Sequence, residues 1–287
     1  MLISLPLSVL KYFSGKFGMN DFTHYVSFLY LILLFVPFFK KKWKIIIIVI
    51  CFISIFYDLK SRSNILNFGF ISILFFLAIF KNLNTLKYLK KIRVFLLFLP
   101  FFLVTLSFFG LNIFVFFDEY KTEYSIKGKD NLDISMVNDS RTGVYLDAWN
   151  GVTKENNLIF GISAAGYHDT FLKDIFDGSN LKNGRLGSEV GILEYLLRGG
   201  LVFVLVIVLL HYFASKLAIY KSNNLLCKFL GVYISFRLFF LFIEAQVSFN
   251  LSNISTFLAL GLCLNQTFRN FTNNEMKTFL NRIFYKM

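Results

Sequence analysis

Apolar residues occur along this chain in long blocks that short polar, mostly basic stretches separate. A helix that crosses a bilayer needs about 20 apolar residues, and roughly 17–25 are tolerated. The pattern predicts an all-α, polytopic transmembrane protein, although the second and third blocks are short and could instead form a re-entrant pair. The seven predicted helical segments are residues 23–39, 44–57, 65–80, 94–117, 190–214, 225–247 and 249–268.

The same pattern divides the chain into four regions. We predict N-terminal transmembrane helices in 1–117, a large extracytoplasmic loop in 118–189, C-terminal transmembrane helices in 190–268 and a basic cytoplasmic tail in 269–287. In the tail, Phe279, Arg282, Ile283 and Lys286 recur at helical spacing. This spacing favours an amphipathic helix on the anionic inner leaflet, with a disordered basic tail as the alternative.

The distribution of charge supports this topology. The net charge is +13, yet residues 118–189 contain 12 acidic and 8 basic residues, so the rest of the chain holds 22 basic and 5 acidic ones. The basic residues follow the first, third, fifth and seventh segments, which the positive-inside rule places in the cytoplasm. We therefore expect the 118–189 loop on the opposite side and no nucleic-acid partner. The three cysteines have unrelated spacings and predict neither a disulfide framework nor a zinc site.

The 118–189 loop contains enough apolar residues to fold. Tyr145, Ala148 and Val152 fit one face of a short helix that Asp139 or Ser140 would cap. Two glycines at 161 and 166 then interrupt the chain before His168. Because loops longer than about 15 residues are usually functional or disordered, we expect the chemistry of the protein here.

This region contains the stretches SRTGVYLDAW, NNLIFGISAAGYH and GRLGSEVGILEYLLRGGLVFVL. Their order and spacing are similar to those of the signature region of the bacterial O-antigen polymerase and ligase family. Upstream, LKSRSNILNFGFISILFF resembles that family's entry into a transmembrane helix. The resemblance covers residues 54–208, and fuller members have more helices, so we expect N-terminal helices to be missing from this chain. Ser188-Glu189 stands where the ligases carry a His-Asn pair, and His168-Asp169 occurs earlier in the chain. Glu in place of His at this position is closer to a polymerase than to a ligase.

The resemblance implies a membrane glycosyltransferase that polymerises polyprenyl-diphosphate-linked repeat units into O-antigen or capsule-like polysaccharide, including lipopolysaccharide, of the bacterial cell envelope. It implies location in the bacterial inner membrane and chemistry without a metal or other cofactor. The expected partners are the lipid-linked glycan donor and acceptor, membrane lipids and a regulator of chain length.

Such a transfer needs cations that hold the diphosphate and a base that takes the hydroxyl proton. Arg62 and Arg141 are the favoured diphosphate ligands, and Arg185 is a third candidate. The base is either Glu189 or His168, and the residues alone leave this open. For all five, a structural or surface role is the competing interpretation.

Four charged residues lie inside predicted membrane segments. Glu194 and Arg198 are spaced for an intrahelical ion pair near the interface. Arg237 and Glu244 share one helical face and are expected to line a polar cavity or to pair with a neighbouring helix.

Two other functions remain open. A transporter or flippase for a lipid-linked or anionic substrate would show internal repeats and broken helices in matching halves, and no repeat is visible. A non-catalytic remnant of a longer enzyme is the third interpretation.

Overall fold

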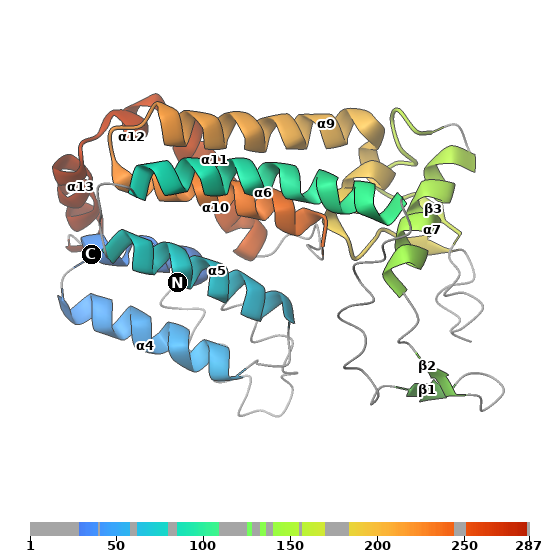
Figure 1. Ribbon diagram of the computed structural model, residues 1–287, viewed down its shortest axis with the longest axis horizontal. Helices are drawn as coiled ribbons and strands as arrows, with labels where there is room; N and C mark the ends of the chain where they lie inside the picture. Colours follow the sequence, from blue (N-terminus) through green and yellow to red (C-terminus); the bar gives the residue numbers. More distant parts are fainter. Residues whose placement is uncertain are drawn as a thin grey trace. The chain divides into compact units, whose positions relative to one another are not determined.

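A computed structural model describes most of the chain as helices (Figure 1). The described residues are 29–39, 41–57, 62–79, 85–108, 125–127, 133–135, 140–154, 157–169, 184–243 and 251–285. They confirm the predicted all-α class; the strands are only two or three residues long. By contacts the chain forms two compact units, one of Met1–Val94, His211–Arg237 and Ser248–Met287, and one of Phe95–Leu210 and Leu238–Val247.

The first unit is built from helices of both ends of the chain. It contains α3 (Leu29–Leu33), the 3-10 turn η1 (Val36–Phe38), α4 (Lys41–Tyr57), α5 (Arg62–Ile79), α11 (Leu251–Leu264), α12 (Gln266–Asn270) and α13 (Asn273–Tyr285). Three longer helices contribute residues to both units: α6 (Thr85–Phe108), α9 (Gly191–Tyr220) and α10 (Leu225–Leu241).

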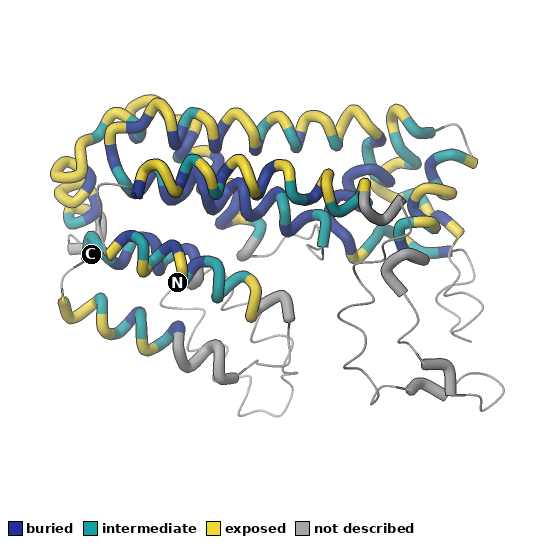
Figure 2. Tube along the Cα trace, in the orientation of Figure 1, coloured by how far each residue is buried: buried dark blue, intermediate teal, exposed yellow. Residues whose placement is uncertain are grey.

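The core of the first unit lies around α10, which is buried along almost its whole length (Figure 2). Phe229, Leu230 and Ile234 are at most 2% exposed. Phe236 stacks on Phe70 of α5 with the ring centroids 4.0 Å apart. A helix that is apolar on every side must be buried or lie in lipid, and α10 is buried by its own protein.

The amphipathic helix expected in the tail is present as α13. It begins with a capping box: the Thr272 backbone N–H donates to Glu275 Oε2 at 2.7 Å, and the Glu275 N–H donates to Thr272 Oγ1 at 3.3 Å. The Thr272 backbone N–H, together with the Thr272 hydroxyl that donates to Glu275 Oε2 at 2.9 Å, holds the pKa of Glu275 below its usual range. Met276 and Leu280 are buried, whereas Phe279 is exposed. Phe279 is therefore an apolar side chain on the outer face of the described part of α13.

The second unit contains the described parts of the polar loop. Its elements are β1 (Ser125–Lys127), β2 (Asp133–Ser135), α7 (Ser140–Lys154), β3 (Tyr167–His168) and β4 (Arg185–Leu186), followed by the first 20 residues of α9. β1 pairs with β2 and β3 pairs with β4, both antiparallel. The predicted loop helix is confirmed: Val144, Ala148 and Val152 of α7 pack on the start of α9.

The predicted segments differ from the helices at several places. The first segment contains only a short helix and a 3-10 turn in its described part, residues 29–39. The fourth starts nine residues earlier than predicted, at Thr85, so the basic stretch before it is helical. The fifth is interrupted at Gly200, where φ is 65° and ψ is −164°. The sixth ends as a helix at Leu241, six residues earlier than predicted, and the seventh is divided at Asn265 between α11 and α12.

By length and composition, one described helix, Gly191–Tyr220, is apolar enough to cross a membrane. Two shorter apolar helices are Ile65–Ile79 and Asn253–Leu264. One such helix is weak support for a membrane protein, because buried helices of soluble proteins can have the same composition.

Candidate functional site

The second unit brings three predicted site residues together. The antiparallel register pairs Tyr167 with Leu186 and His168 with Arg185. Arg185 Nη2 in turn donates to Glu189 Oε1 at 2.8 Å. Strand pairing thus connects His168 to Arg185, and a side-chain ion pair connects Arg185 to Glu189, although His168 and Arg185 are 17 positions apart in the sequence.

His168 is buried rather than solvated. Its side chain packs against α7, where a Cβ on Gly151 would lie 2.8 Å from the His168 Cβ. The residue is 6% exposed, and its Nδ1 atom is buried without a hydrogen-bond partner. Buried polar atoms without a partner are rare in native proteins, and a catalytic role is one explanation for them.

The surroundings of His168 favour the neutral imidazole. Burial is the main cause that lowers its pKa, and the positive charge of Arg185 lowers the pKa further. The carboxylates of Asp147, Glu194 and Asp169 oppose this shift but do not cancel it. A neutral imidazole can accept a proton, which is what a general base near pH 7 requires.

Arg185 and Glu189 differ in exposure. The Arg185 side chain is 16% exposed, whereas that of Glu189 is 64% exposed. A guanidinium has five N–H donors, so its bond to Glu189 leaves further donors for an anionic ligand. Glu189 is already engaged in an ion pair, so it is a weaker candidate for the base than the sequence suggested.

Glu194 and Arg198 form the predicted intrahelical ion pair, and Glu194 Oε1 accepts from the guanidinium of Arg198. Glu194 is only 3% exposed, and its Oε2 accepts from the backbone N–H of Ser188. Gly187 has a φ of 81°, and a Cβ there would lie 2.5 Å from that same oxygen. Glu194 therefore fixes the turn that leads from Arg185 into α9.

A loop of the second unit fills the interruption of α9. The Leu201 N–H donates to the Leu158 carbonyl at 2.9 Å, and the Val202 N–H donates to the Ile159 carbonyl at 3.3 Å. In return, the Ile162 N–H donates to the Leu197 carbonyl at 2.7 Å. Backbone groups that the break leaves without helical partners are thus satisfied by the loop.

Two glycines permit this close approach. A Cβ on Gly200 would lie 2.2 Å from the Ile159 carbonyl oxygen, and one on Gly161 would lie 2.5 Å from the Leu197 carbonyl oxygen. Both glycines have positive φ, of 65° and 73°. Glu194 and Arg198 lie before the break, in the part of α9 that packs with α7. They therefore belong to the folded loop and not to the apolar helix that follows Gly200.

Two further candidates, Arg62 and Arg141, lie at the start of helices. Arg62 is the first residue of α5, in the first unit, and Arg141 is the second residue of α7. The side chains of both lie outside the described residues, as do Glu244 and the candidate cap Asp139. The prediction that Arg62 and Arg141 act together stays a prediction.

Arg237 of α10 is 6% exposed and lies among polar side chains of two other helices. Its Nε donates to Thr256 Oγ1 at 3.0 Å, and its Nη1 and Nη2 atoms donate to Asn67 Oδ1 at 3.3 Å and Asn253 Oδ1 at 3.5 Å. The expected polar surroundings of Arg237 are present. The bonds from α10 to α5 and α11 give this residue a role in packing the first unit.

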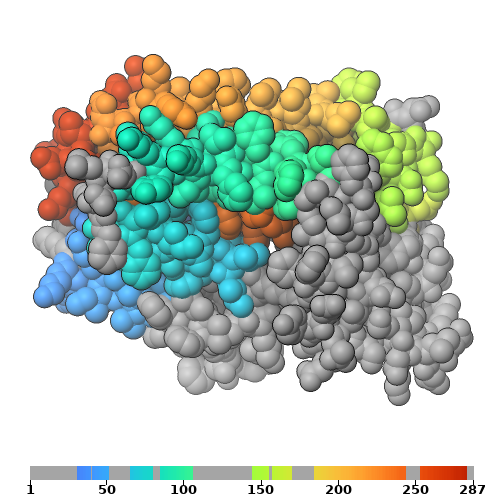
Figure 3. Space-filling view, in the orientation of Figure 1, coloured from blue at the N-terminus to red at the C-terminus, as the bar shows by residue number. Residues whose placement is uncertain are grey.

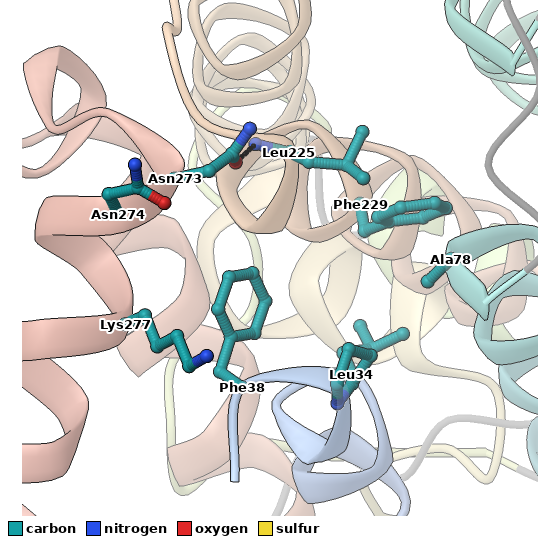
Figure 4. Close-up of a pocket in the computed structure, with 9 residues that line it drawn as sticks. Leu34, Phe38, Ala78, Leu225, Phe229, Asn273, Asn274 and Lys277 are labelled. Carbon is teal, nitrogen blue, oxygen red and sulfur yellow. Dashed lines mark hydrogen bonds between the residues drawn. The ribbon is translucent and has the colours of Figure 1, made fainter.

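A separate cavity of about 230 Å³ lies in the first unit, where Lys277 and Asn274 of α13 face Phe38 and Leu34 (Figure 4). At its edge the Leu225 N–H donates to Asn273 Oδ1 at 2.8 Å. None of the predicted catalytic residues lines this cavity.

Among the described residues, no group of three or more His, Cys, Asp or Glu side chains is arranged to hold a metal ion. In comparisons with protein-family models, curated proteins and solved structures, nothing matches the chain.

Proposed function

We propose that the chain is a membrane glycosyltransferase that extends a polyprenyl-diphosphate-linked glycan at the extracytoplasmic face. The observation that carries the proposal is the juxtaposition of His168, a buried imidazole with an unpartnered Nδ1, and Arg185 through paired strands. The resemblance of this region to O-antigen polymerases and ligases supplies the reaction.

In the proposed reaction the hydroxyl oxygen of the acceptor sugar attacks the anomeric carbon of the donor. His168 accepts the hydroxyl proton as a glycosidic bond forms and the bond from the anomeric carbon to the diphosphate oxygen breaks. Polyprenyl diphosphate leaves with the bonding electron pair. Arg185 stabilises the negative charge that develops on the leaving group, and Glu189 holds Arg185 in place.

Membrane insertion is part of the proposal and is supported by the second part of α9. Residues 201–220 follow the break and form a helix of 20 residues. At about 1.5 Å per residue this helix is about 30 Å long, which matches the hydrocarbon thickness of a bilayer. Several of its apolar side chains are exposed, including Leu205, Val206 and Leu209.

The test is reconstitution in proteoliposomes with a polyprenyl-diphosphate-linked oligosaccharide from the native host. The readouts are glycan chain length on a gel and release of free polyprenyl diphosphate. We expect both with the wild type, and we expect His168→Gln to reduce the rate roughly 10²- to 10⁴-fold, the usual contribution of a general base. Lys154→Gln is the matched control, because it removes only an exposed ion pair to Asp169 in the same unit.

Normal chain growth with His168→Gln at equal abundance and equal protease resistance excludes His168 as the base. If Glu189→Gln is the inactive variant instead, the base is Glu189. If the Lys154→Gln control also loses activity, the activity losses of the His168 and Glu189 variants come from misfolding of the loop.

The second candidate function is transport of a lipid-linked or anionic substrate, and the interruption of α9 at Gly200 favours it. The helices in the described ranges contain no second interruption that would match the first by symmetry. The same proteoliposomes distinguish the two functions. A transporter moves the lipid-linked glycan to the other leaflet without changing its length and releases no free polyprenyl diphosphate.

A further inference from the structure

A cluster of cations lies in the first unit, where the start of α6 and the end of α9 adjoin (Figures 1 and 3). The Arg93 guanidinium lies 5.0 Å from the centre of the Tyr212 ring and 5.7 Å from that of Tyr220. Lys90 Nζ lies 5.0 Å from the Tyr220 ring, and Lys216 Nζ lies 5.7 Å from the Tyr212 ring. Two aromatic rings thus hold three cations in one place.

Arg93 is 4% exposed, and its described hydrogen bonds go to neutral acceptors. Its Nε donates to Ser215 Oγ at 3.0 Å, and its Nη2 donates to the Tyr212 carbonyl at 3.2 Å. A buried charge usually has a partner of opposite charge, because desolvation otherwise costs several kcal/mol. None of the ion pairs among the described residues includes Arg93, Lys90 or Lys216.

The surrounding charges are positive as well. Lys228 of α10 lies close enough to Lys90 for the two ammonium groups to repel each other. Lys87 and Lys91 are exposed on the same helix as Lys90. Cations that gather without a described carboxylate are complementary to a bound anion with several oxygen acceptors, which a phosphate group provides.

The position of the cluster indicates where such a phosphate would come from. Tyr220 is the last residue of α9, the one described helix apolar and long enough to span, and Tyr212 lies about two turns earlier. Tyr212 and Tyr220 are partly exposed, and so are the apolar neighbours Phe213 and Val94. Tyrosines and basic residues at the end of an apolar helix are typical of the headgroup level of a bilayer.

We propose that Arg93, Lys90 and Lys216, with the rings of Tyr212 and Tyr220, form a binding site for the phosphate of an anionic phospholipid. Arg93 supplies the fixed donor, and the two lysines close on the phosphate from α6 and α9. Basic sites between helices on the cytoplasmic side bind phospholipid headgroups in this way. The proposal depends on membrane insertion but not on glycan transfer, since none of its residues belongs to the His168 site.

The test uses the full-length protein purified in a neutral detergent. Thermal unfolding and native mass spectrometry are recorded with dioleoyl phosphatidylglycerol, with dioleoyl phosphatidylcholine, and with inorganic pyrophosphate. We expect stabilisation and retained lipid with phosphatidylglycerol alone. We expect the double variant Lys90→Gln/Lys216→Gln to bind phosphatidylglycerol roughly 10- to 30-fold more weakly, because it loses two direct cationic contacts to the phosphate.

The matched control is Lys87→Gln/Lys91→Gln, which removes two exposed charges from the same helix and leaves the tyrosine rings untouched. It should bind phosphatidylglycerol as the wild type does, within about twofold. If both double variants lose the same affinity for phosphatidylglycerol, the lipid is held by diffuse attraction to the charged surface and the proposed site is refuted. Equal stabilisation by phosphatidylcholine, or by pyrophosphate, overturns the proposal because the ligand would then be the acyl chains or a soluble anion. All of these readouts are independent of glycosyltransferase activity.

Discussion

The parts of α9 before and after Gly200 are both rich in apolar residues but have different surroundings. Before the break, Ile192, Leu193 and Leu197 are buried against α7, and Glu194 is buried with them. After it, Leu201, Leu205 and Leu209 are exposed. Apolar composition alone does not separate the two parts, since both are rich in leucine. The difference teaches that the first part belongs to the folded loop, whereas the second leaves an apolar face uncovered by the described residues, as the proposed contact with lipid requires.

The largest effect is expected for Gly200→Ala, which places a Cβ on a residue with positive φ, 2.2 Å from the Ile159 carbonyl oxygen. We expect a loss of stability on the order of 4 kcal/mol, because the loop cannot dock on α9 without moving the backbone. Differential scanning fluorimetry and limited proteolysis of the purified protein measure it. Gly261→Ala is the control, since its Cβ would have no atom within 4 Å. Equal melting temperatures of the two variants would contradict the role of the break.

The second largest effect concerns lipid contact. Leu209→Asp places a carboxylate at an exposed position near the middle of residues 201–220. Insertion of that segment should become less favourable by about 3 kcal/mol in a translocon insertion assay. Leu146→Asp on α7, also exposed, is the control and should change stability by at most about 0.5 kcal/mol. Unchanged insertion of Leu209→Asp means that this surface does not face lipid.

A smaller effect is expected for Glu194→Gln, which leaves Arg198 without its carboxylate and weakens the bond to the Ser188 N–H. The Arg198 side chain is 38% exposed, so solvent screens part of the loss. We expect about 1–2 kcal/mol from denaturant unfolding of the loop, followed by tryptophan fluorescence. Glu189→Gln, in an exposed ion pair, should cost at most about 0.5 kcal/mol. The reverse order of the two variants would refute the role assigned to Glu194.

The smallest effect is a dependence of loop stability on pH. Burial lowers the pKa of His168 in the folded state, so the unfolded chain binds a proton more readily. The stabilising contribution is therefore present above about pH 6.5, the pKa of an exposed histidine, and is lost as the pH falls towards the folded-state pKa. Melting temperatures from pH 8 to pH 5 test this. His168→Gln should remove that part of the pH dependence, and an unchanged profile in this variant would assign it to other groups.

Much of the fold could be predicted from local pattern. The apolar runs located α4, α5 and the starts of α10 and α11 to within three residues, because a continuous apolar block determines a helix locally. The spacing of Tyr145, Ala148 and Val152 located α7 in the same way. The Thr272-x-x-Glu275 capping box was also readable and would have given the start of α13.

The interruption of α9 was not predicted, because its cause is not local. The sequence Gly199-Gly200 within an apolar block is compatible with a continuous helix, and only the docking of residues 158–162 provides partners for the broken backbone. For the same reason, sequence gave no sign that His168 lies opposite Arg185, since strand register depends on the distant pairing. The burial of Arg93, one of the basic residues after the third predicted segment, could not be predicted either, because it depends on Tyr212 and Ser215 of another helix.

The docking of the loop on α9 has a consequence for the order of assembly during translation. Leu158 precedes Leu201 by 43 residues, so the carbonyl that caps the second part of α9 leaves the ribosome before its partner is made. At about 5–20 residues per second, the wait lasts roughly 2–9 seconds. The buried His168 and Leu197 both lie against Gly151 of α7, so this part of the loop is also completed only after the first part of α9 has emerged. The nascent loop therefore cannot acquire its final structure, or the environment of its imidazole, until the following helix is synthesised.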